Sequence, residues 1–239
     1  MAREHSRARA RPRESNDVRA QVSTRMTSPE APPSMPLPHI IPQAPEFGRP
    51  AIWLARCPSA SLAEQRQRVD ELLQSVFDTP PFRAAARPTL MHDPQGRPTL
   101  SEPYAALPIS IAHTPGVVAV AVGTPGQYIG VDVEFRHRQV RKDRIAARVF
   151  SAAEQSHAET SPGAFWAIWT RKEALLKALG LGLGDTDWSR YDTGDPGGAH
   201  STVTLPHALV SDVWSGEAIV GHLWVDELCV GWACRPRTT

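Results

Sequence analysis

The chain has 239 residues, of which 41% are hydrophobic, and this size suits one domain or two small ones with a substantial core. A formal net charge of +1 gives no overall signal for binding nucleic acid or an acidic substrate. Three cysteines are too few, and odd in number, for a disulfide framework, and no apolar run is long enough to span a membrane. With no apolar stretch typical of a signal peptide near the start, we expect a cytoplasmic protein.

Residues 1–48 differ in composition from the rest of the chain. Arginine is frequent at first, and proline then recurs every few residues. Because closely spaced prolines block helices and sheet ladders, this pattern predicts a disordered basic arm followed by an extended linker. The alternatives are an arm that contacts nucleic acid or an acidic partner, and a translation start placed too far upstream.

The first folded elements begin near residue 50. Residues 51–55 are apolar and predict a short buried strand. Ser61 and Glu64 have the spacing of a capping box, which predicts a helix over 62–77. Two prolines follow, at 80 and 81, and end that helix.

The next segment predicts strands joined by short turns. Residues 88–100 predict a strand, a turn and a strand, with Arg97 on the rim of the turn. A guanidinium there could bind phosphate, although a lone arginine in a turn is more often simply exposed. Strands over 107–114 and 117–122 follow, and His113 lies at the end of the first. This histidine is either half-buried and structural or a hydrogen-bond donor to phosphate.

A turn at 124–126 leads to the strand 128–134, which we expect to complete an antiparallel meander. Alternation puts Asp132 and Glu134 on one face, about 7 Å apart. Two carboxylates on one face repel each other unless they are solvated or bridged by a cation. Oxygen ligands without sulfur suit Mg²⁺ or Mn²⁺.

Residues 135–160 are basic and predominantly helical. We expect one helix at 141–149 and a second from 152, where Ser151 and Glu154 again form a capping-box pattern. The basic residues form either a solvated face or a docking face for an acidic partner.

The segment from about 163 to 179 predicts a helix with one apolar stripe that ends at two glycines. Glu173 and Lys177 are four residues apart on one shoulder of the stripe, and Lys172 lies within it. If the helix packs on the Asp132 and Glu134 face, three carboxylates surround one ion and the lysines face its anion. The alternative is an exposed Glu–Lys pair, with Lys172 extended toward solvent.

Strands are expected again at 201–205, 218–225 and 228–234. A helix followed by a sheet occurs twice along the chain. This repeat predicts an α/β fold made of two similar halves, 49–135 and 136–239. The strand that carries the acids belongs to the first half and the central helix to the second. A cleft between halves is a common place for a ligand site.

Five motifs occur in one order and resemble those of the Sfp-type 4′-phosphopantetheinyl transferases, over roughly residues 88–185. They are Gly96-Arg-Pro98, Ser110-Ile-Ala-His-Thr114, Gly130-Val-Asp-Val-Glu134, Phe150-Ser-Ala-Ala-Glu154 and Trp169-Thr-Arg-Lys-Glu-Ala-Leu-Leu-Lys177. Two departures are visible: the start of the first half is short, and Ala112 stands where the family usually has serine.

The resemblance implies a fold and a reaction. The fold is a pseudo-dimer of two α/β halves with coenzyme A (CoA) bound between them. The reaction moves the 4′-phosphopantetheine arm of CoA to a serine of a carrier protein and releases adenosine 3′,5′-bisphosphate. By position, Asp132, Glu134 and Glu173 hold Mg²⁺, and Glu173 accepts the serine proton.

The remaining implied roles concern phosphate groups and the partner. Lys177 and Lys172 face the diphosphate, His113 and Thr114 contact CoA phosphates, and Arg97 flanks the nucleotide. The partner is an acyl or peptidyl carrier protein with an acidic surface, and a monomer is sufficient. Candidate contacts to that surface are Arg136, Arg138, Arg141 and Lys142. The competing interpretations are a non-catalytic module that binds CoA or a carrier protein, and a Mg²⁺-dependent phosphodiesterase.

Overall fold

The computed structural model describes residues 39–41, 48–58, 61–78, 80, 82, 86–185, 187–205 and 216–237. Most of the predicted N-terminal arm therefore lies outside the described residues. The exception is a short strand, β1 (His39–Ile41), which pairs antiparallel with β2 (Ala51–Cys57). These three residues lie in the proline-rich stretch predicted as an extended linker, and the disorder of the basic arm before them stays a prediction.

The first sheet has the strand order β1-β2-β6-β5, where β5 is Ile109–Thr114 and β6 is Gly116–Val122. Helix α2 (Leu62–Phe77) packs on it and begins where predicted, because the Ser61 hydroxyl accepts a hydrogen bond from the Glu64 backbone N–H. A separate hairpin of β3 (Leu90–His92) and β4 (Pro98–Leu100) carries the Arg97 turn.

The second sheet has the order β7-β10-β9-β8 and is antiparallel throughout. Its strands are β7 (Gln127–Phe135), β8 (His200–Leu205), β9 (Gly216–Val225) and β10 (Leu228–Pro236). Three helices accompany it, α3 (Lys142–Val149), α4 (Ala152–Thr160) and α5 (Pro162–Leu179), and a 3₁₀ turn, η1 (Trp188–Arg190), follows. Ser151 and Glu154 form the predicted capping box of α4.

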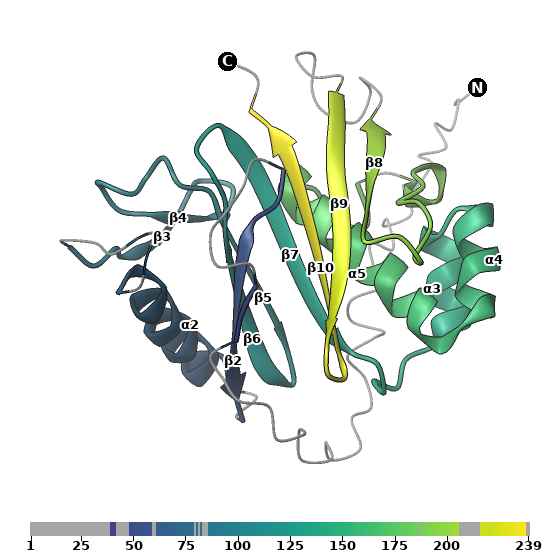
Figure 1. The fold of residues 1–239 in the computed structure, drawn as a ribbon, viewed down its shortest axis with the longest axis horizontal. Helices are drawn as coiled ribbons and strands as arrows, with labels where there is room; N and C mark the ends of the chain where they lie inside the picture. Colours follow the sequence, from purple (N-terminus) through teal and green to yellow (C-terminus); the bar gives the residue numbers. More distant parts are fainter. Residues whose placement is uncertain are drawn as a thin grey trace, which may run out of the picture.

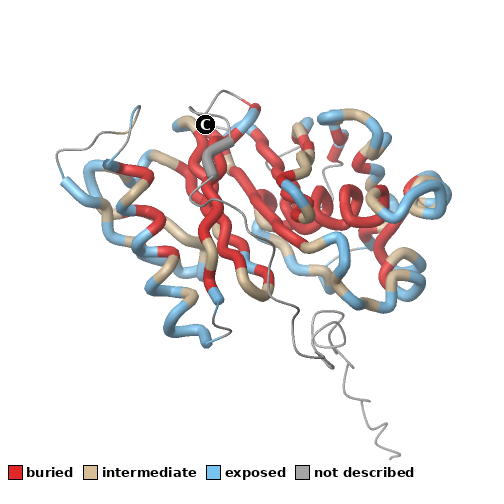
Figure 2. The backbone as a smooth tube through the Cα atoms, turned by 60° about the horizontal axis from the view of Figure 1, so that its bottom comes forward, coloured by how far each residue is buried: buried red, intermediate tan, exposed pale blue. Residues whose placement is uncertain are grey.

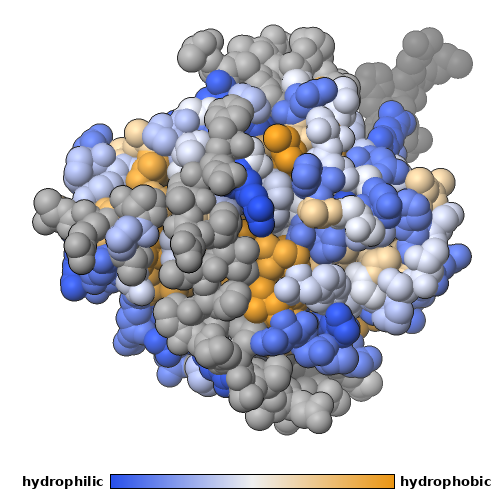
Figure 3. Space-filling view, viewed as in Figure 1, coloured by the Kyte–Doolittle hydropathy of each residue, from blue (hydrophilic) through white to orange (hydrophobic). Residues whose placement is uncertain are grey.

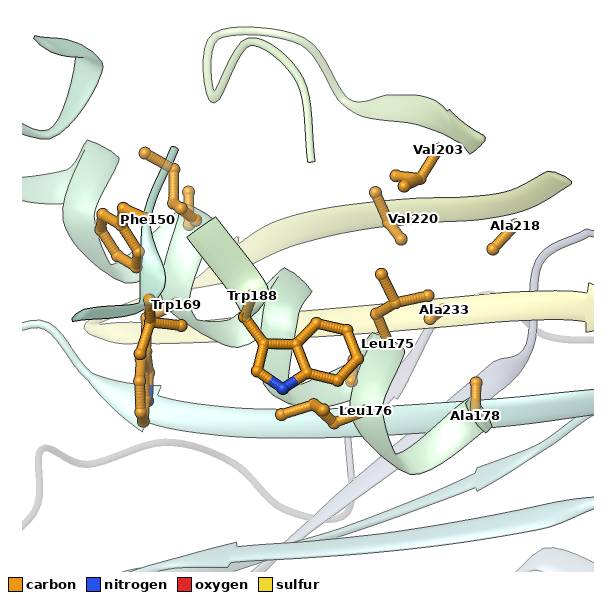
Figure 4. Packing of buried hydrophobic residues seen from close by; sticks show 14 of the residues in the cluster. Phe150, Trp169, Leu175, Leu176, Ala178, Trp188, Val203, Ala218, Val220 and Ala233 are labelled. Atoms are coloured by element: carbon orange, nitrogen blue, oxygen red, sulfur yellow. The ribbon is translucent and has the colours of Figure 1, made fainter. Parts of the chain in front are cut away.

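The elements lie in layers, with the two sheets facing each other between α2 and α5 (Figure 1). Side chains of both sheets, such as Leu54 and Val131, form one core between them. Figure 2 shows that α5 is buried along nearly its whole length. Figure 4 shows Leu176 beside Trp188, and Leu175 directed toward the strands. The predicted α/β fold is confirmed, and the pseudo-two-fold relation between its halves stays a prediction.

Strand β7 corrects one part of the predicted topology. It pairs with β10 over nine residues of each strand and not with β6, so the predicted hairpin and meander are wrong. Strand β7 belongs to the second hydrogen-bonded sheet, so the boundary between the two sheets lies before β7 in the chain. The predicted boundary between the two halves lies later, after residue 135. Within the described ranges, no helix is long and apolar enough to cross a membrane.

Candidate active site

Two glycines allow helix α5 to lie directly on the carboxylate face of β7. A Cβ atom at Gly130 would lie 2.8 Å from the Ala174 carbonyl carbon and 2.9 Å from the Ala178 nitrogen. Gly231 of β10, which pairs with Asp132, faces the Thr170 backbone in the same way. Since strand residues alternate, Asp132 lies on the same face as Gly130 and therefore under the helix.

Asp132 and Lys177 form an ion pair between β7 and the last turn of α5. Lys177 Nζ lies 3.0 Å from Asp132 Oδ1 and also donates to the Val131 carbonyl at 2.8 Å. Asp132 is buried, and its second oxygen, Oδ2, accepts no hydrogen bond from any described group. A buried carboxylate oxygen without a donor is costly, and a bound cation would relieve that cost.

Glu134 is buried further along the same face and is held from two sides. Thr114 Oγ1 of β5 donates to Glu134 Oε2 at 3.0 Å, and Arg138 forms an ion pair with Oε1. Burial raises the pKa of Glu134 to about 7, and the negative charge of Asp132 adds to this rise, while Arg138 and Thr114 oppose it. Additional positive charge at this position would therefore stabilise the ionised carboxylate.

Glu173, the third predicted ligand, is buried on α5 one turn before Lys177. However, the described residues contain no group of three or more His, Cys, Asp or Glu side chains arranged to hold a metal ion. A metal site formed jointly by Asp132, Glu134 and Glu173 therefore stays a prediction. The donors nonetheless fit Mg²⁺ in kind, because they are carboxylate oxygens and Asp132 Oδ2 has no hydrogen-bond partner among the residues that the structure describes.

Lys172 does not face this site, which corrects the prediction that it binds the anion. Its Nζ lies 2.8 Å from Glu154 Oε2 and donates to the carbonyls of Trp188 and Tyr191. Residue 172 is rotated by about 100° from residue 173 around the helix, so the two side chains point to different neighbours. Lys172, the charged residue within the apolar stripe, thus has a buried partner, Glu154. The periodicity of the helix alone could not identify this partner.

The three other predicted residues lie at different places around β7. Thr114 is buried and contacts Glu134 as described, whereas the neighbouring His113 side chain is exposed. Arg97 lies against the C-terminal end of α5, where its Nη2 donates to the Leu179 carbonyl at 3.0 Å. The structure thus brings Thr114 to the carboxylates and Arg97 to the far end of the helix.

Arg138 and Ser110 have site contacts that the sequence did not reveal. Arg138 was predicted to contact a carrier protein, yet it pairs with Glu134. The Ser110 hydroxyl accepts a hydrogen bond from the Val131 N–H at 3.1 Å and so joins β5 to β7. The four-residue spacing of Glu134 and Arg138 was the only available signal for the ion pair.

Residues 128–222 match the 4′-phosphopantetheinyl transferase superfamily. The chain is 32% identical over 98 residues to the 4′-phosphopantetheinyl transferase AcpT of Salmonella typhimurium, covering 39% of this chain and 50% of that protein. It is also 32% identical over 98 residues to a putative 4′-phosphopantetheinyl transferase of Synechocystis sp., covering 38% and 39% respectively.

A third relative, the AcpT protein of Escherichia coli K12, is 30% identical over 98 residues, with 39% of this chain and 49% of the relative covered. The chain thus spans about half the length, or less, of the curated relatives it matches. The matched segment contains β7 and α5, the two elements that carry Asp132, Glu134, Glu173 and Lys177.

Proposed function

We propose that this protein transfers the 4′-phosphopantetheine group of CoA to a serine of a carrier protein, because residues 128–222 match the 4′-phosphopantetheinyl transferase superfamily. The observation that carries the proposal is the ion pair of the buried Asp132 with the half-buried Lys177, beside Glu134, at the contact of β7 with α5. We further assign the chain to the Sfp type, on the order of its five motifs. The phosphodiesterase alternative has no support from the comparisons.

The proposed roles follow from charge and position. Asp132, Glu134 and Glu173 would hold Mg²⁺, which when bound supplies positive charge to the diphosphate of CoA. Lys177 neutralises charge on the diphosphate and the leaving group, since its ammonium already lies at the carboxylate face. Glu173 accepts the proton of the attacking serine hydroxyl. Phosphoryl-group transfer depends mainly on such positioning and charge stabilisation.

The proposed partner is an acyl or peptidyl carrier protein with an acidic surface around its serine. The basic segment beside the site provides complementary charge, and hydrophilic residues cover the edge of the molecule over α3 and α4 (Figure 3). Of the predicted contacts, Arg141 is exposed, whereas Arg136 pairs with Glu227 and lies over the Trp224 ring. A cytoplasmic, monomeric enzyme that uses Mg²⁺ or Mn²⁺ remains part of this proposal.

Mass spectrometry of an apo carrier protein tests the proposal directly. Incubation with the protein, CoA and Mg²⁺ should add the mass of one phosphopantetheinyl group to the carrier. The gain should disappear with EDTA and fall at least 100-fold in rate with Glu173→Gln, because the substitution removes both a ligand charge and a base. No gain on any acyl or peptidyl carrier, together with CoA binding, would favour the non-catalytic module.

A further inference from the structure

Two hydroxyl side chains of β5 reach across the outer edge of β7, which is the terminal strand of the second sheet. Ser110 and Thr114 are four residues apart, so they lie on the same face of β5, and both are buried. The Ser110 hydroxyl accepts a hydrogen bond from the Val131 N–H at 3.1 Å, and Thr114 Oγ1 donates to Glu134 Oε2 at 3.0 Å. The first sheet therefore contacts both the backbone of β7 and one of its carboxylates.

Thr114 is the more rigid of the two partners that hold Glu134. The terminal torsion of a glutamate side chain is soft, so the plane of its carboxylate is set by the groups that contact its two oxygens. Arg138, on Oε1, has a long side chain that is 28% exposed. Thr114 is only 2% exposed, and because a β-branched side chain has few rotamers, its hydroxyl is held in one place. The orientation of Glu134 thus depends mainly on Thr114.

This hydrogen bond leaves Glu134 able to bind a cation. An ionised carboxylate has about four acceptor positions, and Thr114 and Arg138 take two of them. Carboxylates that ligate metals are in general hydrogen-bonded themselves, and loss of such a partner typically lowers metal affinity by about 10–100-fold. The neighbouring Asp132 has instead an oxygen without a donor among the described groups. The two acids thus combine one oriented carboxylate with one open oxygen.

We infer that Thr114 is a positioning residue, which orients Glu134 for the divalent cation. The inference rests on the proposed function, because it needs the cation at Glu134. It differs from the role that the sequence resemblance implies for Thr114, a contact with CoA phosphates. A threonine hydroxyl has one proton, and because Thr114 donates it to Glu134, that proton is not available to a phosphate. The first sheet then acts on the affinity for the cation, although the proposed ligands belong to β7 and α5.

The test measures Mn²⁺ binding to the full chain without CoA, by the electron paramagnetic resonance signal of the free ion. Thr114→Val removes the hydroxyl and keeps the branched shape of the side chain. Its Kd for Mn²⁺ should rise about tenfold, the lower end of the effect expected for loss of a group that orients a ligand. Thr114→Ser keeps the hydroxyl and should restore most of the affinity. Melting curves check that the variants fold, and Thr114→Ala takes the place of Thr114→Val if the latter does not.

Thr202→Val is the matched control. Thr202 is exposed on β8, at the opposite edge of the same sheet, so loss of its hydroxyl should leave the Kd for Mn²⁺ unchanged. CoA binding adds a second comparison, made by calorimetry at a Mg²⁺ concentration that saturates each protein. Under that condition, Thr114→Val should bind CoA as tightly as the unmodified protein does, because the cation site is already filled.

Three results would overturn the inference while leaving the proposed function intact. An unchanged Kd for Mn²⁺ in a folded Thr114→Val variant would mean that Glu134 needs no orientation from β5. Equal loss of affinity in Thr114→Val and Thr114→Ser would mean that the site depends on the packing of the threonine and not on its hydroxyl. Weaker CoA binding at saturating Mg²⁺ would assign Thr114 to a CoA phosphate. If the unmodified protein binds no Mn²⁺, or if Glu134→Gln binds it as tightly, the proposed cation site is itself refuted, and this inference with it.

Discussion

Gly130→Ala should both destabilise the protein and separate the two sides of its site. The new Cβ atom would lie 2.8 Å from the Ala174 carbonyl carbon, whereas ordinary contacts begin at 3.4 Å. The Ala174 carbonyl oxygen would lie closer still, at 1.9 Å, so helix α5 must move by about 1 Å or more, and its backbone cannot turn aside as a flexible side chain could. Overpacking of this kind costs up to about 3 kcal/mol, and we expect the upper end because the obstacle is helix backbone.

A loss of about 3 kcal/mol lowers the melting temperature of a chain of this length by about 6–12 °C. The same movement carries Lys177 away from Asp132, from which it now lies 3.0 Å. Since small misplacements can reduce rates about 100-fold, carrier modification should fall by a similar factor. Circular dichroism melting and the mass-spectrometric assay measure the two effects.

Gly184→Ala is the matched control, because a Cβ atom there meets nothing within 4 Å and the backbone is not in the left-handed region. We expect its melting temperature to stay within about 2 °C of that of the unmodified protein. If Gly130→Ala also melts within this range, α5 does not rest on β7 as described. The argument that this glycine sets the spacing between helix and carboxylates would then be wrong.

Two further predictions concern buried charge away from the carboxylates. Glu154→Gln leaves Lys172 buried without its ionic partner and should lower the free energy of unfolding, measured in urea, by about 3–5 kcal/mol. The double variant with Lys172→Met should recover much of that loss. A double variant no more stable than the single one would contradict the pairing. Burial and the nearby Arg171 lower the pKa of His222 to about 4, so the unfolded state binds its proton first and stability falls as the pH drops from 6.5 to 4. His222→Asn should remove up to about 3 kcal/mol of that fall, and parallel stability–pH curves for the variant and the unmodified protein would refute the assignment.

Local chemistry made several elements predictable from the sequence. The capping boxes that begin with Ser61 and Ser151 indicated the starts of two helices, because both partners of each lie within four residues. Strand alternation likewise put Asp132 and Glu134 on one face. These inferences needed only neighbouring residues, and the structure agrees with them.

Partners that are distant in the sequence were not predictable in this way. Strand β7 pairs with β10 about a hundred residues later, and no local pattern distinguishes that pairing from a meander with β6. The ion pair of Lys172 with Glu154 depends on how α4 packs beside α5. The helix periodicity indicated that Lys172 needs a partner, but only the tertiary fold decides which acid supplies it.

The charges around β7 explain why the proposed ligands suit this site. Asp132 and Glu134 already have cationic partners, Lys177 and Arg138, so the two ion pairs are neutral together. Glu173 adds one negative charge to this group when ionised. A bound divalent cation would change the net charge of the site from −1 to +1. A diphosphate with two negative charges would then bring the net charge back to −1. The diphosphate without the cation would instead bring the net charge of the site to three negative charges, so the diphosphate should bind only together with the cation.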